Sequence, residues 1–306
     1  MGLIKDIKNW LLNKQYNYIN LETSILEAYS GLLETHQKIC FFASYDEKGK
    51  IDEYVFKYLS QLYENEFDIY FCTTTSTPID EDDLQKLKLL CVKIFRRKNV
   101  GLDFCSWKTC YINLNKTIYY KQILLTNDSI LGPIFDLKTI FSKIKDTDSD
   151  LIGLTDNYEY SYHIQSYFLL FKEKAVQEFL PQFMSNVKVF YDKNLIVEKY
   201  EIGLSTLMLN KGYKIQALFP FENTLQKALE LSSFEYFDEI RIRKVNSTIY
   251  FWNILIEEFG FPFIKRELLT KNVIKLNSLN QWKLIISKYN HEISTVISNY
   301  LLRLKN

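Results

Sequence analysis

Short apolar runs alternate along this chain with segments whose apolar residues recur every three or four positions, and this alternation constrains the fold most strongly. The runs at 39–44 (ICFFAS) and 67–74 (FDIYFCTT) are typical of strands buried on both faces. Between them, the spacing of Val55, Tyr58, Leu59 and Leu62 predicts a helix. Because neighbouring parallel strands need a long crossover connection, usually a helix, this order predicts an α/β fold with a largely parallel sheet.

The alternation continues over most of the chain. Segment 161–171 alternates enough to form a further strand, which would give the sheet a mixed edge. The apolar spacing is helical before residue 38 and again near the C-terminus. We therefore predict a helical extension over 1–37, a Rossmann-type α/β domain over 38–270 and a helical tail over 271–306. Within the domain we expect strands at 91–99, 120–129 and 149–157, and helices at 80–90, 104–114, 135–144, 172–183 and 197–213.

Composition limits the classes of function. The 38 Lys+Arg residues balance 37 Asp+Glu, so the net charge of +1 would not draw the chain onto nucleic acid, and we expect no nucleic-acid partner. The five cysteines form no CxxC pair, which favours a reducing compartment over a structural zinc site. No stretch of 18 apolar residues and no signal peptide is found, so we expect a cytoplasmic protein. Its amphipathic ends suit peripheral attachment to the inner face of the cytoplasmic membrane, and equally suit packing helices or a dimer contact.

Basic residues precede a glycine turn where the strand expected at 91–99 ends. Arg96 and Arg97 are followed by Gly101, which permits close backbone approach, and by Asp103 at the start of the next helix. Basic side chains and free helix N–H groups suit a diphosphate. The alternative interpretation is a solvated strand end followed by a helix that Asp103 caps.

A polar run, Asn127-Asp128-Ser129, follows the apolar strand expected at 120–129. Mg²⁺ and Mn²⁺ prefer oxygen ligands, and one or two carboxylates together with a substrate diphosphate suffice to hold them. Asp128 is therefore a candidate metal ligand. An Asx-turn that only ends the strand explains the same residues equally well.

Two later segments carry groups that suit sugar chemistry. If 161–171 is a strand, His163, Gln165 and Tyr167 share one face, where they could bind hydroxyls and stack on a sugar ring. Glu201 lies near the N-terminus of the helix expected at 197–213 and suits a general base toward an attacking hydroxyl. A half-buried histidine in a Tyr-rich sheet and a carboxylate that neutralises a helix dipole are the alternative interpretations.

Taken together, these segments resemble the rhamnan synthesis protein F family, glycosyltransferase-like proteins of bacterial surface-polysaccharide assembly. The resemblance covers roughly residues 39–269. Each segment is weak alone, and the set is specific. The segments that carry it are FFASYDEKGKIDEYVFKYLSQL, NVGLDFCSWK, ILLTNDSILGPIF, DLIGLTDNYEYSYHIQSYFLLFK, KYEIGLSTLMLNKGYK and FGFPFIKRELL.

The resemblance implies a nucleotide-sugar-dependent glycosyltransferase with a GT-A type fold, in which the nucleotide binds at the carboxyl ends of the strands. It implies a nucleoside diphosphate sugar as donor, with rhamnose or another hexose, and a lipid-linked glycan as acceptor. A divalent metal, Mn²⁺ or Mg²⁺, held by Asp128 would bind the donor diphosphate. The donor-binding residues it implies are Ala43, Ser44, Arg97, Asn99, Gly101, Asp103, Asn127, Asp128, Lys265 and Arg266.

The resemblance also implies catalytic and sugar-binding residues. Glu201 is expected to deprotonate the acceptor hydroxyl, with Asp156 as its rival. His163, Gln165 and Tyr167 are expected to bind the acceptor or the donor sugar.

The chain departs from the family pattern in its acidic motifs. Only Asp128 is acidic in its motif, so a basic side chain is the alternative partner for the diphosphate. The thinned motifs leave open a second function, a non-catalytic glycan-binding or scaffold member of a polysaccharide assembly complex. A nucleotidyltransferase is a third class, but it needs a Gly-rich phosphate loop, and segment 39–50 carries only Gly49.

Overall fold

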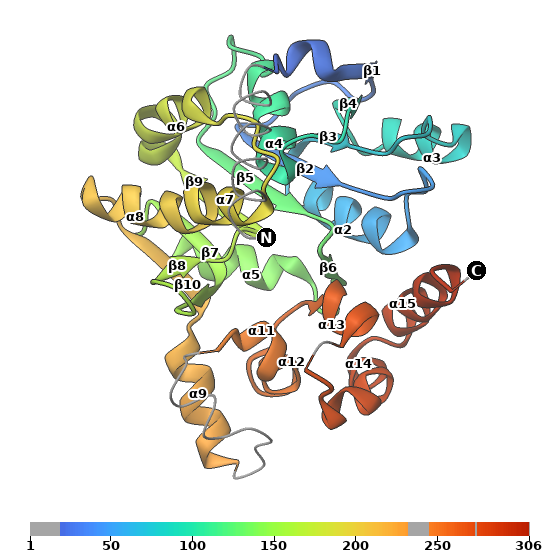
Figure 1. Cartoon of the computed structure of the whole chain (residues 1–306), viewed down its shortest axis with the longest axis vertical. Helices are drawn as coiled ribbons and strands as arrows, with labels where there is room; N and C mark the ends of the chain where they lie inside the picture. The colour runs from blue at the N-terminus through green and yellow to red at the C-terminus, as the bar shows by residue number, and fades with distance from the viewer. Residues whose placement is uncertain (1–18, 232–244, 273, 306) are drawn as a thin grey trace, which may run out of the picture.

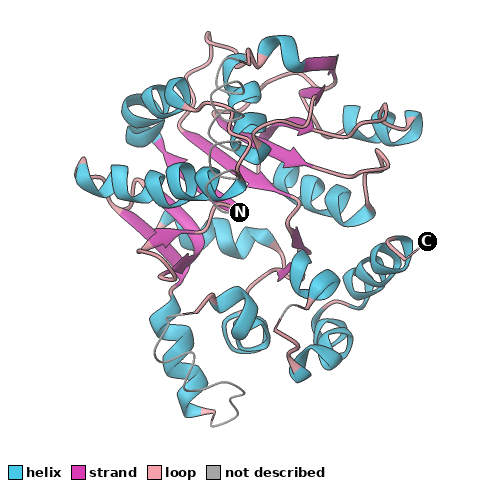
Figure 2. Ribbon diagram, viewed as in Figure 1, coloured by secondary structure: helices cyan, strands magenta, loops and turns pink. Residues whose placement is uncertain are grey.

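The computed structural model describes residues 19–231, 245–272 and 274–305. Within these residues, nine strands form one mixed sheet in the order β1-β4-β3-β2-β5-β9-β7-β10, with β8 paired to β7 (Figures 1 and 2). The predicted mixed α/β sheet flanked by helices is confirmed. The strands are β1 Ile25–Ser30, β2 Lys38–Ser44, β3 Asp68–Thr73, β4 Lys93–Arg97, β5 Gln122–Asn127, β7 Leu151–Asn157, β8 His163–Ile164, β9 Phe168–Lys172 and β10 Ile215–Phe219.

The strand directions bring the candidate residues to one edge of the sheet. Strands β4, β3, β2 and β5 run parallel to one another, and β10 runs parallel to β7. Strand β9 is antiparallel to both β5 and β7, so these two also point the same way. The carboxyl ends of β2, β3, β4, β5, β7 and β10 therefore meet at one edge, which we call the carboxyl edge.

Helices cover both faces of the sheet. Alternate residues of β2 belong to different cores: Cys40 and Phe42 pack with α2, α5, α12 and α15, whereas Phe41 and Ala43 pack with α4, α6 and α8. The helices are α2 Glu53–Glu64, α3 Glu81–Lys88, α4 Leu102–Ile112, α5 Leu137–Lys145, α6 Leu180–Asn186, α7 Lys193–Ile196, α8 Gly203–Asn210, α9 Phe221–Glu230, α11 Ser247–Tyr250, α12 Trp252–Phe259, α13 Arg266–Lys271, α14 Trp282–Tyr289 and α15 His291–Arg303. Short 3-10 helices span Glu22–Ser24 and Asn277–Gln281, and π-helical turns span Ala175–Phe179 and Val197–Ile202.

The prediction of a helical extension over 1–37 is wrong for 25–30, and residues 1–18 lie outside the described ranges. Residues Ile25–Ser30 form β1, which pairs antiparallel with β4. Their burial alternates every second residue, as expected for a strand with one exposed face. A strand forms here because the open edge of β4 offers backbone hydrogen-bond partners that a helix would leave unused. At the other end of the chain, helices α14 and α15 confirm the predicted helical tail and break at Asn290.

A second, two-stranded sheet ties the C-terminal part of the chain to the carboxyl edge. Strand β6 (Ile130–Leu131), just after β5, pairs antiparallel with β11 (Ile264–Lys265), and Figure 1 shows α13 beside β6. The Arg266 N–H donates to the Ser129 carbonyl oxygen at 2.9 Å. This pairing places the first residue of α13 next to the end of β5.

Gly132 is required for this close approach. Its φ is +152°, and a Cβ there would lie 2.6 Å from the Pro262 carbonyl oxygen and 2.8 Å from the Phe263 ring. At Gly212, where φ is +79°, a Cβ would meet nothing within 4 Å. At Gly212 only the backbone conformation favours glycine, whereas at Gly132 a packing constraint is added.

We predict that Gly132→Ala lowers the free energy of unfolding more than Gly212→Ala does. Gly212→Ala should cost about 1–2 kcal/mol for the left-handed backbone alone. Gly132→Ala should cost at least about 1–2 kcal/mol more, because the added methyl pushes 262–263 away from the turn. Urea denaturation of both variants measures the difference. Equal costs would show that the contact with 262–263 is not tight.

Candidate functional site

Asp128 is the centre of the carboxyl edge. The residue is 6% exposed, and its Oδ2 accepts hydrogen bonds from the Ser44 hydroxyl at 2.9 Å and the Tyr45 N–H at 2.8 Å. Oδ1 lies 3.2 Å from Nη1 of Arg266. The Asp128 N–H donates to the Ala43 carbonyl oxygen at 3.2 Å. The structure thus brings together four of the predicted donor-binding residues, Ala43, Ser44, Asp128 and Arg266.

Asp103 lies beside this cluster. Its Oδ2 accepts a hydrogen bond from the side-chain amide of Asn127 at 2.8 Å, and the Asn127 Oδ1 accepts from the Ser129 N–H and hydroxyl. Burial first, and then the nearby negative charge of Asp128, raise the pKa of Asp103 to about 6, against the opposing effect of Arg266. Asp103 is therefore a carboxyl group whose pKa is raised well above its ordinary value.

Arg97 does not lie open to a ligand, which corrects its predicted role. It is fully buried, and its guanidinium donates to the carbonyl oxygens of Lys98, Val100 and Leu102 and to the Ser106 hydroxyl. Arg97 is thus a positioning residue that holds the turn before α4.

Gly101 and Asn99 belong to the same turn. Gly101 has φ +69°, and a Cβ there would lie 2.2 Å from the Cys105 sulfur, so the close approach that it permits is to α4. Asn99 is exposed. Contacts within the protein therefore fix this turn, and Asp103 follows it in the first turn of α4.

The two predicted base candidates lie in different settings. Asp156 is 4% exposed at the end of β7, and its Oδ1 accepts from the Phe221 N–H at 2.7 Å, at the start of α9. Burial raises the pKa of Asp156. Glu201 is half-buried, and its Oε1 accepts from the Ser166 N–H at 3.0 Å. It lies in the π-helical turn Val197–Ile202, between α7 and α8, just before α8 begins at Gly203.

The sugar-binding candidates do not share one strand face, which corrects that prediction. Strand β8 ends at Ile164, and the chain turns before β9. Gln165 and Tyr167 converge instead on the Thr155 hydroxyl, at 2.6 and 2.5 Å, and both are 3% exposed. His163 is also 3% exposed, with its Nδ1 bonded to the Ser161 carbonyl oxygen at 2.8 Å.

Lys265 and Arg266 link this second cluster to Asp128. The Lys265 Nζ lies over the Tyr167 ring, 5.9 Å from its centroid, and the neighbouring Arg266 meets Asp128. Tyr167 lies near both base candidates, because its hydroxyl meets Thr155, the residue before Asp156, and the neighbouring Ser166 N–H donates to Glu201. The junction of β11 and α13 therefore lies between the two halves of the candidate site.

A divalent metal does not fit the residues at Asp128. Both carboxylate oxygens already meet an N–H, an O–H or the Arg266 guanidinium. A dication bound there would lie beside a positive charge that is 3.2 Å from Oδ1. Within 19–231, 245–272 and 274–305, no group of three or more His, Cys, Asp and Glu side chains is placed to hold a metal.

Sequence reasoning named Arg96 but missed the polar group around it at the ends of β3 and β4. Arg96 is 9% exposed and pairs with Glu27 of β1 at 2.6 Å, yet its Nε and the Oε2 of Glu27 are buried with no hydrogen-bond partner. The Thr73 hydroxyl is buried and unpartnered too. The signal was present in the sequence, because a run of hydroxyl residues (TTTST, 73–77) follows the β3 strand.

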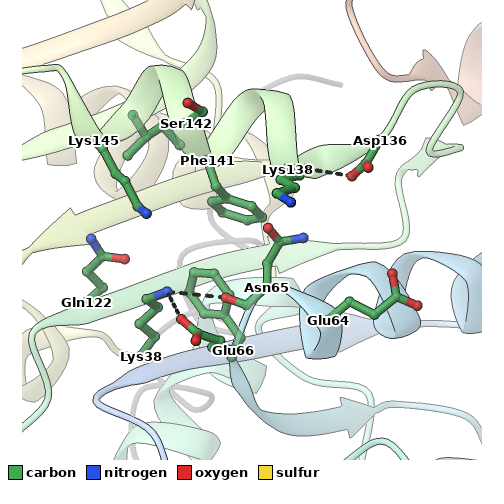
Figure 3. A pocket seen from close by; sticks show the side chains of 12 residues that line it. Lys38, Glu64, Asn65, Glu66, Gln122, Asp136, Lys138, Phe141, Ser142 and Lys145 are labelled. Carbon is green, nitrogen blue, oxygen red and sulfur yellow. Dashed lines mark hydrogen bonds and ion pairs between the residues drawn. The ribbon is translucent and has the colours of Figure 1, made fainter.

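A pocket of about 510 Å³ lies at the opposite edge of the sheet. Lys38 and Gln122, the first residues of β2 and β5, line it together with residues of α5, and Figure 3 shows these side chains facing one another across it. Lys38 binds the Glu66 carboxylate at 2.7 Å. This pocket is at the amino ends of the strands, away from the candidate site.

The site is that of an α/β protein whose polar groups converge at the carboxyl edge of a mixed sheet. Residues 69–303 match the family model described as "Rhamnan synthesis protein F", so the chain belongs to this family and the resemblance is confirmed. The chain is 28% identical over 261 residues to the "Virulence protein VirA" of Vibrio anguillarum, covering 78% of this chain and 81% of that protein.

The chain is also similar in outline to solved structures, one of which is a glycosyltransferase. The glycosyltransferase GlyE of Streptococcus pneumoniae has a TM-score of 0.41 at 11% identity, covering 88% of this chain and 64% of GlyE. Residues 1–349 of TarS of S. aureus give 0.37 at 13% identity, covering 84% and 83%. Likenesses of this size carry no argument about activity. Among the helices that the structure describes, none is long and apolar enough to cross a membrane.

We predict that Asp103→Asn stabilises the protein near neutral pH. The folded pKa of Asp103, about 6, is above the unfolded value of about 3.9, so the native state loses stability as pH rises through this window. At about pH 7.5 the free energy of unfolding of the variant should exceed that of wild type by about 1–3 kcal/mol, and this difference should shrink toward about pH 4. Urea denaturation at several pH values measures it. Asp82→Asn, at an exposed position, is the control and should change stability by less than about 0.5 kcal/mol. A gain independent of pH would contradict the raised pKa.

Proposed function

We propose that this protein is a glycosyltransferase that moves a sugar from a nucleoside diphosphate donor to a hydroxyl of a glycan acceptor. One observation carries the proposal. In a chain of the rhamnan synthesis protein F family, Ser44, Asp103, Asn127, Asp128 and Arg266 converge at the carboxyl edge, from elements far apart in the sequence. Ligands of open α/β sheets bind at such an edge.

The donor would lie along this edge. Its nucleoside would lie toward Asp103, which Asn127 holds at this edge. Its diphosphate would lie near Asp128 and Arg266. Rhamnose or another hexose is the sugar that we propose, and the acceptor is a growing, lipid-linked glycan.

Glu201 is the better base of the two candidates. Asp156 is almost fully buried and holds the start of α9, whereas Glu201 is half-buried and near the Lys265–Tyr167 contact. In the proposed step, the Glu201 carboxylate takes the proton of the acceptor hydroxyl. The acceptor oxygen bonds to the anomeric carbon, the bond from that carbon to the diphosphate breaks, and the nucleoside diphosphate leaves with its electron pair.

A non-catalytic glycan-binding or scaffold role is the second candidate. The observation that favours it is that Asp128, Asp156 and Glu201 all accept hydrogen bonds from backbone N–H groups, as structural carboxylates do. This role predicts binding of glycan without donor binding or turnover.

Thermal melting with UDP-, GDP- and dTDP-sugars, and with a CMP-sugar as a donor that lacks a diphosphate, tests the proposal. One diphosphate donor class should raise the melting temperature of wild type and of Glu201→Gln equally, because a ligand that binds the native state stabilises it. Glu201→Gln keeps an oxygen for the Ser166 N–H, so its fold should be intact.

Turnover is then measured as release of nucleoside diphosphate with membrane-extracted lipid-linked glycan as acceptor. Glu201→Gln should lower the rate about 100- to 10,000-fold, whereas Glu198→Gln, an exposed residue of the same helical segment, should not. A protein that binds glycan but is shifted by no donor would be the scaffold instead.

A further inference from the structure

The diphosphate of a sugar donor needs a cation, and the structure offers one from an unexpected part of the chain. Arg266 is the first residue of α13, far along the chain from Asp128. The β6–β11 pairing and the bond from the Arg266 N–H to Ser129 fix its backbone beside the end of β5. Its side chain therefore starts from a rigid position next to the predicted metal position.

Of the two paired side chains, the Arg266 guanidinium is more accessible to a ligand than the Asp128 carboxylate. The Arg266 side chain is 25% exposed, whereas that of Asp128 is 8% exposed and lies behind it against Ser44 and Tyr45. Asp128 engages Nη1. An arginine has five N–H donors in a planar fork, which matches two oxygens of a phosphate.

A second cation lies next to Arg266 in the chain. Lys265 precedes Arg266 and lies over the Tyr167 ring, on the side of the base candidates. Consecutive cations at the junction of β11 and α13 would meet both ends of a diphosphate that runs from Asp128 toward Glu201. The carboxylate of Asp128 keeps Arg266 in place, as a buried partner fixes an arginine rotamer.

We propose that Arg266, with Lys265 beside it, neutralises the donor diphosphate in place of a metal ion, so that donor binding is independent of divalent metal. The inference rests on the proposed function and names the chemistry of the same site. Arg266 stabilises the negative charge that the leaving diphosphate gains when the bond to the sugar breaks. Asp128 is then a positioning residue for Arg266.

Calorimetric titration with UDP, GDP and dTDP tests the inference, each in excess EDTA and again with Mg²⁺ or Mn²⁺. Wild type should bind one of these nucleotides in EDTA, and added metal should change the dissociation constant by less than about twofold. Arg266→Gln should weaken binding about 10- to 100-fold, as the loss of charge-assisted hydrogen bonds predicts. Lys271→Gln, a cation at the other end of α13, is the matched control and should bind as wild type does.

The double variant Asp128→Asn/Arg266→Gln guards against misfolding, since it leaves no unpaired charge in the buried position. It should melt as a folded protein and bind the nucleotide as weakly as Arg266→Gln. Binding that appears only with metal would overturn the inference and leave the proposed function standing. Binding in EDTA that survives Arg266→Gln would overturn the role of Arg266. Failure of wild type to bind any of the three nucleotides would overturn both the inference and the proposed function.

Discussion

The contact between Asp128 and Arg266 joins two parts of the chain that are far apart in sequence. Asp128 directly follows the central strand β5, and Arg266 begins a short helix that β6 and β11 hold against that strand. A buried carboxylate is costly unless donors surround it, and here Ser44, Tyr45 and Arg266 provide them. The C-terminal helices are thus part of the carboxyl edge, and without α13 Asp128 would be a buried charge that lacks a counter-charge.

Other arginines near this edge also bind carboxylate or carbonyl oxygens of the loops. Arg303, at the end of α15, binds both Asp46 and Asp52 in the loop that follows β2. Arg97 is buried under the turn that carries Asp103, where carbonyl oxygens use its donors. Buried or half-buried arginines, Arg266 among them, therefore fix the loops of this edge.

Much of the sheet could be predicted from the sequence, because strands buried on both faces are continuous apolar runs. The carboxyl-edge position of Asp128 followed from its place after such a run. The role of Arg97 was mistaken because a basic residue at a strand end looks solvated. Phe95 is two residues before it and packs on the α4 side, so strand alternation already placed Arg97 under that helix.

The contacts that matter most could not be predicted in this way. Nothing local in Lys265-Arg266 shows that this pair returns to β5, because the β6–β11 register depends on the whole sheet. Residues 25–30 have apolar spacing that also fits a helix, and only the open edge of β4 decides for a strand. The helical pattern at 197–213 placed Glu201, but it did not show that the first part of this segment, Val197–Ile202, is a π-helical turn.

A double-mutant cycle on stability tests the central claim that Asp128 is already the partner of Arg266. The free energy of unfolding would be measured for wild type, Asp128→Asn, Arg266→Gln and the double variant. Our account predicts that the double variant loses less stability than the two single losses summed, by at least about 1 kcal/mol, because each single change leaves a buried group without its partner. Losses that add to within about 0.3–0.5 kcal/mol would show that the two side chains do not interact, and would contradict the account.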